Sequence, residues 1–215
     1  MNYIYLVIFI ITTLVHLYAT YSNNRPFRNV TKGFIILSLL GFYHTSVKDP
    51  SWFIIIAILL SWIGDVLLIP KGKKWFVAGG SAFLVSHIFF ILGYNELFDI
   101  RSVPLYFIIP VACLYVLACV GVFIKLKQYL PKLLILPMFF YLLLNGTMNS
   151  FAWYRMIEGF SVPTLMTVIG SVLFFISDTA LFFVDFNKNS RMRSHFLVML
   201  TYSLGEFLII LGLIL

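Results

Sequence analysis

The sequence predicts an all-α, polytopic membrane protein, a bundle of eight transmembrane helices. Its 215 residues are 61% apolar and 11% charged, whereas soluble domains average about 45–50% apolar and about 25% charged. At about 20 residues per span, a chain of this length holds at most about ten helices. No room remains for a separate soluble domain, so we interpret residues 1–215 as a single transmembrane helical domain.

Eight apolar runs follow one another along the chain, and Pro, Lys and Asn mark most of the gaps between them. The first run is too long for the core of a signal peptide and has no Lys or Arg before it, so we expect it to be retained. The second run is the weakest, because it is short and contains His44. The runs are 3–20, 33–47, 51–70, 76–95, 104–124, 131–150, 163–184 and 196–215.

The Lys and Arg residues alternate along the seven connections as 3, 1, 3, 1, 3, 1 and 3. Under the positive-inside rule, this alternation predicts eight spans, cytoplasmic odd connections and two extracytoplasmic termini. Arg25, Lys73, Lys127 and Arg191 represent the cytoplasmic connections, and Arg155 is assigned to the sixth connection. Because the charges are spread out, the net charge of +7 does not indicate a nucleic-acid partner.

A weak repeat relates the two halves of the chain. The segment Ser-Trp-Ile-Gly-Asp65-Val-Leu-Leu in run three is similar to Phe-Phe-Ile-Ser-Asp178-Thr-Ala-Leu in run seven. His87 in run four corresponds to Glu206 in run eight, and each is followed by apolar residues and a glycine. Four spans per half predict a parallel 4+4 repeat about an axis along the membrane normal.

Three acidic residues, Asp65, Asp178 and Glu206, lie inside predicted spans. A charged side chain at a helix centre costs about 2.5–3.5 kcal/mol, so we expect all three to face the bundle interior. All Lys and Arg lie outside the runs or at their ends, which predicts that no basic side chain neutralises these acids. The two aspartates lie at matching depth, and we expect their carboxyls to approach within about 8 Å.

Other polar residues share helix faces with these acids or with one another. The expected lining of one central cavity is Ser61, His87, Tyr141, Asn145, Tyr202 and Glu206. The alternative is that they only form interhelical hydrogen bonds, which hold many membrane bundles together. His16 lies near the end of its run and is expected at the interface. With His87 as the single mid-span histidine, the sequence predicts no metal site.

Five short motifs occur in an order and spacing that resemble the YhhN-like lysoplasmalogenase family, over residues 25–210. They are Thr31-Lys32, Gly64-Asp65-Val66-Leu67-Leu68, Gly80-x-x-Phe83-x-x-x-His87, Gly170-x-x-x-Phe174-x-x-Ser177-Asp178-x-x-Leu181 and Tyr202-x-x-Gly205. Two positions differ from the family pattern, since Gly33 follows Lys32 in place of Pro and Glu206 stands in place of Gln. The resemblance implies an eight-span hydrolase of the plasma membrane of a bacterium. It would cleave the vinyl ether bond of lysoplasmalogens, or of a related lysolipid, to a fatty aldehyde and a glycerophospho head group.

Vinyl ether hydrolysis needs an acid that protonates carbon and a group that orients water, but no nucleophilic serine and no cofactor. We therefore expect Asp65 and Asp178 to divide the acid and base roles, in an order that the sequence leaves open. Lys32 and the basic loops are expected to hold the phosphate of a lysophospholipid whose chain lies between helices. The oligomeric state stays open.

Two alternatives remain. Buried carboxylates also suit a proton- or cation-coupled transporter, and parallel repeats occur in transporters. Transporters often have Pro or Gly breaks at corresponding spans, whereas Pro110 and Pro137 lie outside the aspartate-bearing runs. The third interpretation is a lipid-binding or scaffold protein without turnover.

Overall fold

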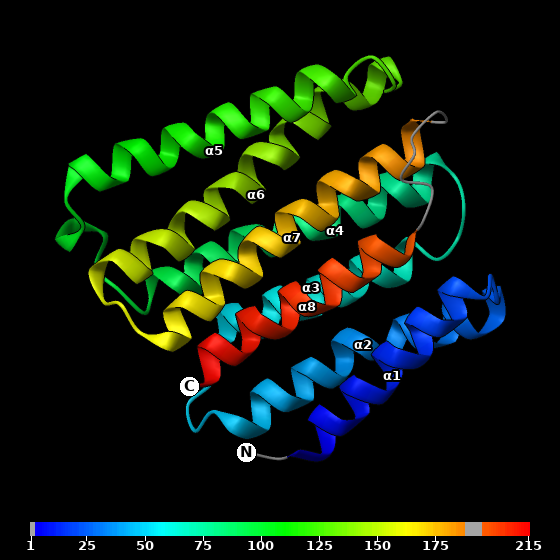
Figure 1. Ribbon diagram of the computed structural model, residues 1–215, viewed down its shortest axis with the longest axis horizontal. Helices are drawn as coiled ribbons and strands as arrows, with labels where there is room; N and C mark the ends of the chain where they lie inside the picture. The colour runs from blue at the N-terminus through cyan, green and yellow to red at the C-terminus, as the bar shows by residue number, and fades with distance from the viewer. Residues whose placement is uncertain (1–2, 188–194) are drawn as a thin grey trace. The chain divides into compact units, whose positions relative to one another are not determined.

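The computed structural model describes residues 3–187 and 195–215, and all regular secondary structure within these ranges is helical (Figure 1). A short 3₁₀ turn, η1 (Ile100–Ser102), precedes the fifth α-helix. The α-helices are α1 (Tyr3–Tyr21), α2 (Arg25–Ser46), α3 (Trp52–Leu67), α4 (Lys73–Asn95), α5 (Leu105–Leu126), α6 (Lys132–Glu158), α7 (Val162–Phe186) and α8 (His195–Ile214). Lys188, Arg191 and Arg193 of the last predicted cytoplasmic connection lie outside the described residues.

Two helices extend well beyond the apolar runs that predict them. Helix α2 begins at Arg25 and not near residue 33, because Asn24 caps it by accepting a hydrogen bond from the Phe27 amide and Pro26 occupies its first turn. Helix α6 continues past residue 150 to Glu158 and ends before Gly159. Caps and turn residues set both ends, whereas apolar runs record only the hydrophobic part of a helix.

Arg155 lies in the last turn of α6 and not in a connection. Its guanidinium donates hydrogen bonds to Thr167 Oγ1 of α7, at 3.1 Å, and to the carbonyl oxygen of Gly212 in α8, at 3.3 Å. The assignment of Arg155 to the sixth connection is therefore wrong, because the helix continues past the apolar run and carries the arginine with it.

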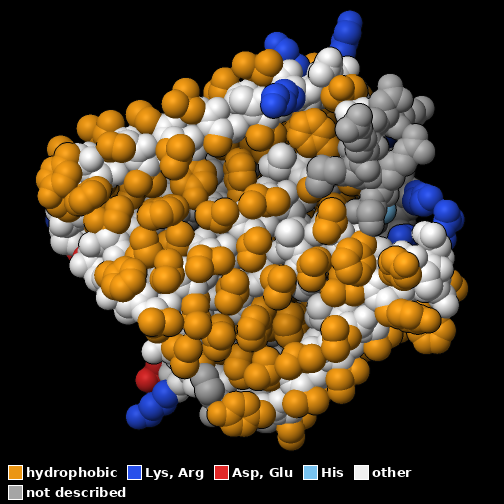
Figure 2. All heavy atoms as spheres, in the orientation of Figure 1, with side chains coloured by type: hydrophobic (Ala, Val, Ile, Leu, Met, Phe, Trp, Pro, Cys, Tyr) orange, Lys and Arg blue, Asp and Glu red, His pale blue; other side chains and the backbone are white. Residues whose placement is uncertain are grey.

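The protein is a multi-pass membrane protein. Within the described residues, six helices are long and apolar enough to cross a bilayer, namely α1, α4, α5, α6, α7 and α8. Apolar side chains cover most of the visible surface, with Lys and Arg near its margins (Figure 2). Helix α3 is apolar but has 16 residues, and α2 carries three basic residues in its first turns. The total of eight spans and the side of the termini stay predictions.

The chain packs as two compact units, residues 1–93 with 213–215 and residues 94–212. In the first unit, α2 packs against α1 and α3, and Gly64 of α3 accommodates the Phe83 ring of α4. In the second unit, α6 packs against α5 and α7. Each unit thus holds one of the two helices that carry the predicted catalytic aspartates.

The helix pairs α3–α4 and α7–α8 make contacts at matching sequence positions. In α3–α4 the positions are counted from Asp65 and His87. In α7–α8 they are counted from Asp178 and Glu206. In both pairs, the residue eleven positions before the aspartate contacts a glycine six positions after His87 or Glu206. The residue eight positions before the aspartate contacts the one directly before His87 or Glu206. The matched contacts are Ile54–Gly93 with Thr167–Gly212, and Ala57–Ser86 with Gly170–Gly205. This common register supports the predicted 4+4 repeat.

Candidate active-site residues

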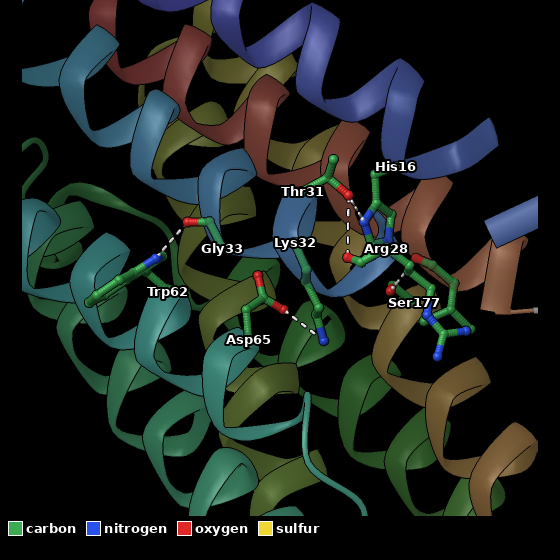
Figure 3. A network of polar contacts seen from close by, with 9 residues as sticks. His16, Arg28, Thr31, Lys32, Gly33, Trp62, Asp65 and Ser177 are labelled. Carbon is green, nitrogen blue, oxygen red and sulfur yellow. Dashed lines mark hydrogen bonds and ion pairs between the residues drawn. The ribbon is translucent and has the colours of Figure 1, made fainter. Parts of the chain in front are cut away.

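Asp65 lies near the end of α3, is 2% exposed and pairs with a lysine of α2. Lys32 Nζ lies 3.3 Å from Asp65 Oδ1 (Figure 3). The expectation that no basic side chain neutralises the buried acids is therefore wrong for Asp65. The expectation is wrong because α2 starts earlier than predicted, which places Lys32 inside a helix. The long apolar stem of a lysine then lets the ammonium reach along the helix to a neighbour.

The residues on either side of Lys32 fix α2 in place. The indole Nε1–H of Trp62 in α3 donates to the carbonyl oxygen of Gly33 at 2.7 Å. On the other side, Nδ1 of His16 in α1 lies 2.9 Å from Thr31 Oγ1 (Figure 3). His16 is 1% exposed, so its predicted interfacial position is wrong, because α2 extends far enough to cover it. These two contacts determine where the Lys32 side chain begins.

Ser61 and His87 are also buried in the first unit. Ser61 Oγ lies 2.9 Å from Ser86 Oγ, and Ser86 Oγ donates to the carbonyl oxygen of Ala57 at 2.8 Å. Ser61 therefore joins α3 to α4, as the interhelical hydrogen-bonding alternative predicts. The His87 side chain lies in the interior of the unit with no exposed surface.

Asp178 lies in α7, is 5% exposed and accepts two hydrogen bonds from α6. The Tyr141 hydroxyl donates to Asp178 Oδ2 at 2.5 Å, and Asn145 Nδ2 donates to the same oxygen at 2.7 Å. The Tyr141 ring also meets Phe182 edge to face, with 5.3 Å between ring centroids. Two donors one helical turn apart therefore converge on one carboxyl oxygen.

Asn149, which the sequence analysis did not single out, orients this group. Its Nδ2 donates to both the backbone oxygen and Oδ1 of Asn145, each at 3.0 Å. The bond to Oδ1 fixes the amide of Asn145 with its nitrogen toward Asp178. Asn149 is fully buried and lies one turn after Asn145 in an apolar helix, so its spacing was a usable signal.

Tyr202 and Glu206 share the buried face of α8. The Tyr202 ring stacks on Phe174 of α7, with 5.4 Å between centroids, and Glu206 has no exposed surface. The candidate residues thus gather in both units, Lys32, Ser61, Asp65 and His87 in the first and Tyr141, Asn145, Asp178, Tyr202 and Glu206 in the second. The expected approach of the Asp65 and Asp178 carboxyls stays a prediction.

The sequence pattern of the YhhN family matches residues 27–213. The chain belongs to the YhhN family. It is also similar to a protein of Dictyostelium discoideum described as a lysoplasmalogenase homolog, with 25% identity over 232 residues that cover 87% of this chain and 76% of the relative. No solved structure matches the chain.

In this YhhN protein, the two aspartates have different surroundings. Asp65 contacts a cation, whereas the contacts described for Asp178 include two uncharged donors. Hydrogen bonds and an opposite charge both stabilise a buried carboxylate. Across residues 3–187 and 195–215, no group of three or more His, Cys, Asp or Glu side chains has the arrangement of a metal site. The partners described for the two aspartates are a lysine, a tyrosine and an asparagine.

Proposed function

We propose that this protein hydrolyses the vinyl ether bond of lysoplasmalogens, or of a related lysolipid, by carboxyl acid–base catalysis. The observation that carries the proposal is the pair of buried aspartates, each held by donors on the preceding packed helix. Membership of the YhhN family and similarity to a lysoplasmalogenase homolog support the substrate class. Asp65 and Asp178 are the proposed catalytic residues.

The reaction requires four proton transfers. Two carry a proton from a carboxyl to the substrate, and two carry a proton back to a carboxylate. The acid donates a proton to the β-carbon of the vinyl ether, which gives an oxocarbenium ion. Water adds to this ion while the base accepts a proton from the water, and a hemiacetal forms. The protonated base then returns its proton to the departing glycerol oxygen, while the first carboxylate accepts the hemiacetal hydroxyl proton. An aldehyde and a glycerophospho alcohol leave, and both carboxyls regain their starting states.

Asn145 and Tyr141 act on Asp178 in this scheme, and Lys32 acts on Asp65. Donors fixed before the reaction stabilise charge without reorganising during it. Ser61, His87, Tyr202 and Glu206 are proposed to line the space for the substrate. The transporter alternative depended partly on buried acids without basic partners, and the Lys32–Asp65 ion pair removes that argument for one of them.

The test is aldehyde release by the purified wild-type protein from a lysoplasmalogen in detergent micelles, followed with an aldehyde-specific reagent. Hydrolysis predicts one aldehyde and one glycerophospho head group per substrate consumed. The saturated alkyl-ether analogue is the control substrate and should release no aldehyde, because it has no double bond to protonate. Proton-coupled flux in proteoliposomes without aldehyde from any vinyl ether lipid would contradict the proposal and favour transport.

A further inference from the structure

We propose that Arg28 and Lys32 together bind the phosphate of the lysolipid head group, with Arg28 as the anchor that determines this specificity. This inference rests on the proposed function for the identity of the lipid. Arg28 and Lys32 lie one turn apart on the same face of α2 (Figure 3). Both side chains are partly buried, whereas Arg25, at the start of the helix, is exposed.

The charges on this face favour an anion. Like charges one turn apart on a helix repel each other. The Asp65 carboxylate offsets the charge of Lys32, but no carboxylate in the described part of the chain forms an ion pair with the Arg28 guanidinium. A planar guanidinium suits the paired oxygens of a phosphate. Lysine has three donor hydrogens, so Lys32 can contact Asp65 and a phosphate oxygen together.

The spacing also fits a glycerophospholipid. Two residues one turn apart are separated by about 6 Å along the helix axis. In the lipid, five bonds separate the ether oxygen on the first glycerol carbon from phosphorus on the third. Three bonds of an extended chain span about 3.6 Å, so these five span about 6 Å. A phosphate at Arg28 therefore places the ether oxygen near the level of Lys32 and its partner Asp65.

The direction of this spacing agrees with the orientation of a lipid in a bilayer. Arg28 is nearer the start of α2, and Asp65 lies before the end of α3 at the level of Lys32. A lipid with its phosphate at Arg28 has its head group near the helix ends and its ether bond about one glycerol deeper. That arrangement matches the order of head group, glycerol and chain along a bilayer normal.

The test measures binding without turnover, in the full-length protein in detergent. The probes are a 1-O-alkyl lysophosphatidylethanolamine, which has no vinyl bond, the matching 1-O-alkylglycerol without phosphate, and soluble glycerophosphoethanolamine without a chain. We expect Arg28→Gln to weaken binding of the phospholipid probe by about tenfold or more, the loss of a charged hydrogen bond. Binding of the alkylglycerol should not change. Arg28→Lys should restore part of the affinity.

Arg25→Gln is the matched control, because it removes an exposed positive charge three residues away from Arg28. It should change the affinity for the phospholipid probe and the affinity for the alkylglycerol by no more than about twofold. Equal weakening of both lipid probes by Arg28→Gln would overturn the proposal, since it would indicate a structural effect. An equal effect of Arg25→Gln would also overturn it, in favour of a diffuse surface field. The proposal would also be overturned if glycerophosphoethanolamine bound as tightly as the phospholipid probe and its binding depended on Arg28. That result would indicate a soluble phosphate ligand. Phosphate-selective binding without aldehyde release from the vinyl analogue would leave this proposal standing and contradict the hydrolase alone.

Discussion

Lys32 and Asp65 each make the burial of the other tolerable. Removing one partner of a buried ion pair leaves an uncompensated charge, which typically costs about 3–5 kcal/mol. Lys32→Met should therefore lower the free energy of unfolding by about 3 kcal/mol, the lower end of that range, because the lysine side chain is 15% exposed. In an Asp65→Asn background the same change should cost much less. Thermal unfolding of the four proteins measures this coupling, and equal losses in the two backgrounds would show that the pair contributes nothing.

Asn149 is predicted to act on the reaction only through Asn145. Asn149→Leu removes the hydrogen bond that orients the Asn145 amide, so kcat should fall by up to about tenfold, the value of one hydrogen bond, with KM unchanged. In an Asn145→Leu background it should have no further effect on kcat. Ser150→Ala is the control, because the Ser150 hydroxyl donates a hydrogen bond to the carbonyl oxygen of Gly146 in its own helix. A full additional loss in the double variant would contradict this role.

The polar residues could be predicted from sequence more readily than their partners. Asp178, Tyr141 and Asn145 are conspicuous in apolar helices, and helical spacing places the last two on one face. The Lys32–Asp65 pair was not predictable from hydropathy, because it depends on the start of α2, which Asn24 and Pro26 determine. Asn149 had the spacing of a neighbour to Asn145, but spacing does not show which amide nitrogen faces which oxygen.

At the scale of elements, α7 and α8 approach closely through glycines. A Cβ atom at Gly170 would lie 2.6 Å from the carbonyl oxygen of Gly205, and one at Gly205 would lie 2.9 Å from that of Gly170. Gly170→Ala and Gly205→Ala should each lower the midpoint of thermal unfolding, because backbone atoms have to separate. Gly121→Ala in α5 is the control, since nothing lies within 4 Å of its Cβ position, and it should be neutral or stabilising by up to about 1 kcal/mol. Destabilisation by Gly121→Ala equal to that at Gly170 would contradict this account.

The existence and order of the eight α-helices in the described residues were predictable, because each contains an apolar run, although the run in α2 is short. The ends of α2 and α6 were not, since capping side chains and turns set them. For the same reason Arg155 was predicted to lie in a connection, whereas its side chain links α6 to α7 and α8 through hydrogen bonds. Interhelical contacts such as Ser61–Ser86 depend on helix rotation, which hydropathy constrains only weakly.

At the scale of the whole molecule, the alternation of basic residues predicts the membrane orientation. The connections near Arg25, Lys73, Lys127 and Arg191 should face the cytoplasm. Single cysteines at these positions, in a variant without Cys113 and Cys119, should resist a membrane-impermeant thiol reagent in intact cells and react after lysis. Labelling of position 73 from outside would contradict the topology.

The repeat also relates the two buried aspartates, one in each unit. The matched contacts of α3–α4 and α7–α8 place Asp65 and Asp178 at equivalent positions in their helix pairs. The sequence predicted this equivalence from short similar strings, and the glycine contacts support it independently. The partners differ, since α2 supplies a lysine and α6 supplies a tyrosine and an asparagine. We infer that the two carboxyls have separate roles in the proposed reaction.

The measurement that tests the central claim most directly is the rate of aldehyde release from a lysoplasmalogen by wild type, Asp65→Asn and Asp178→Asn. Asn preserves size and hydrogen bonding but cannot transfer the proton, so each variant should lose about 10²–10⁴-fold in rate. Both variants should still elute as folded proteins and show a thermal unfolding transition. Asp49→Asn, at an exposed position in a connection, is the control and should keep the wild-type rate. If both buried variants keep more than about a tenth of the wild-type rate, against that expected loss, the assignment of these aspartates is wrong.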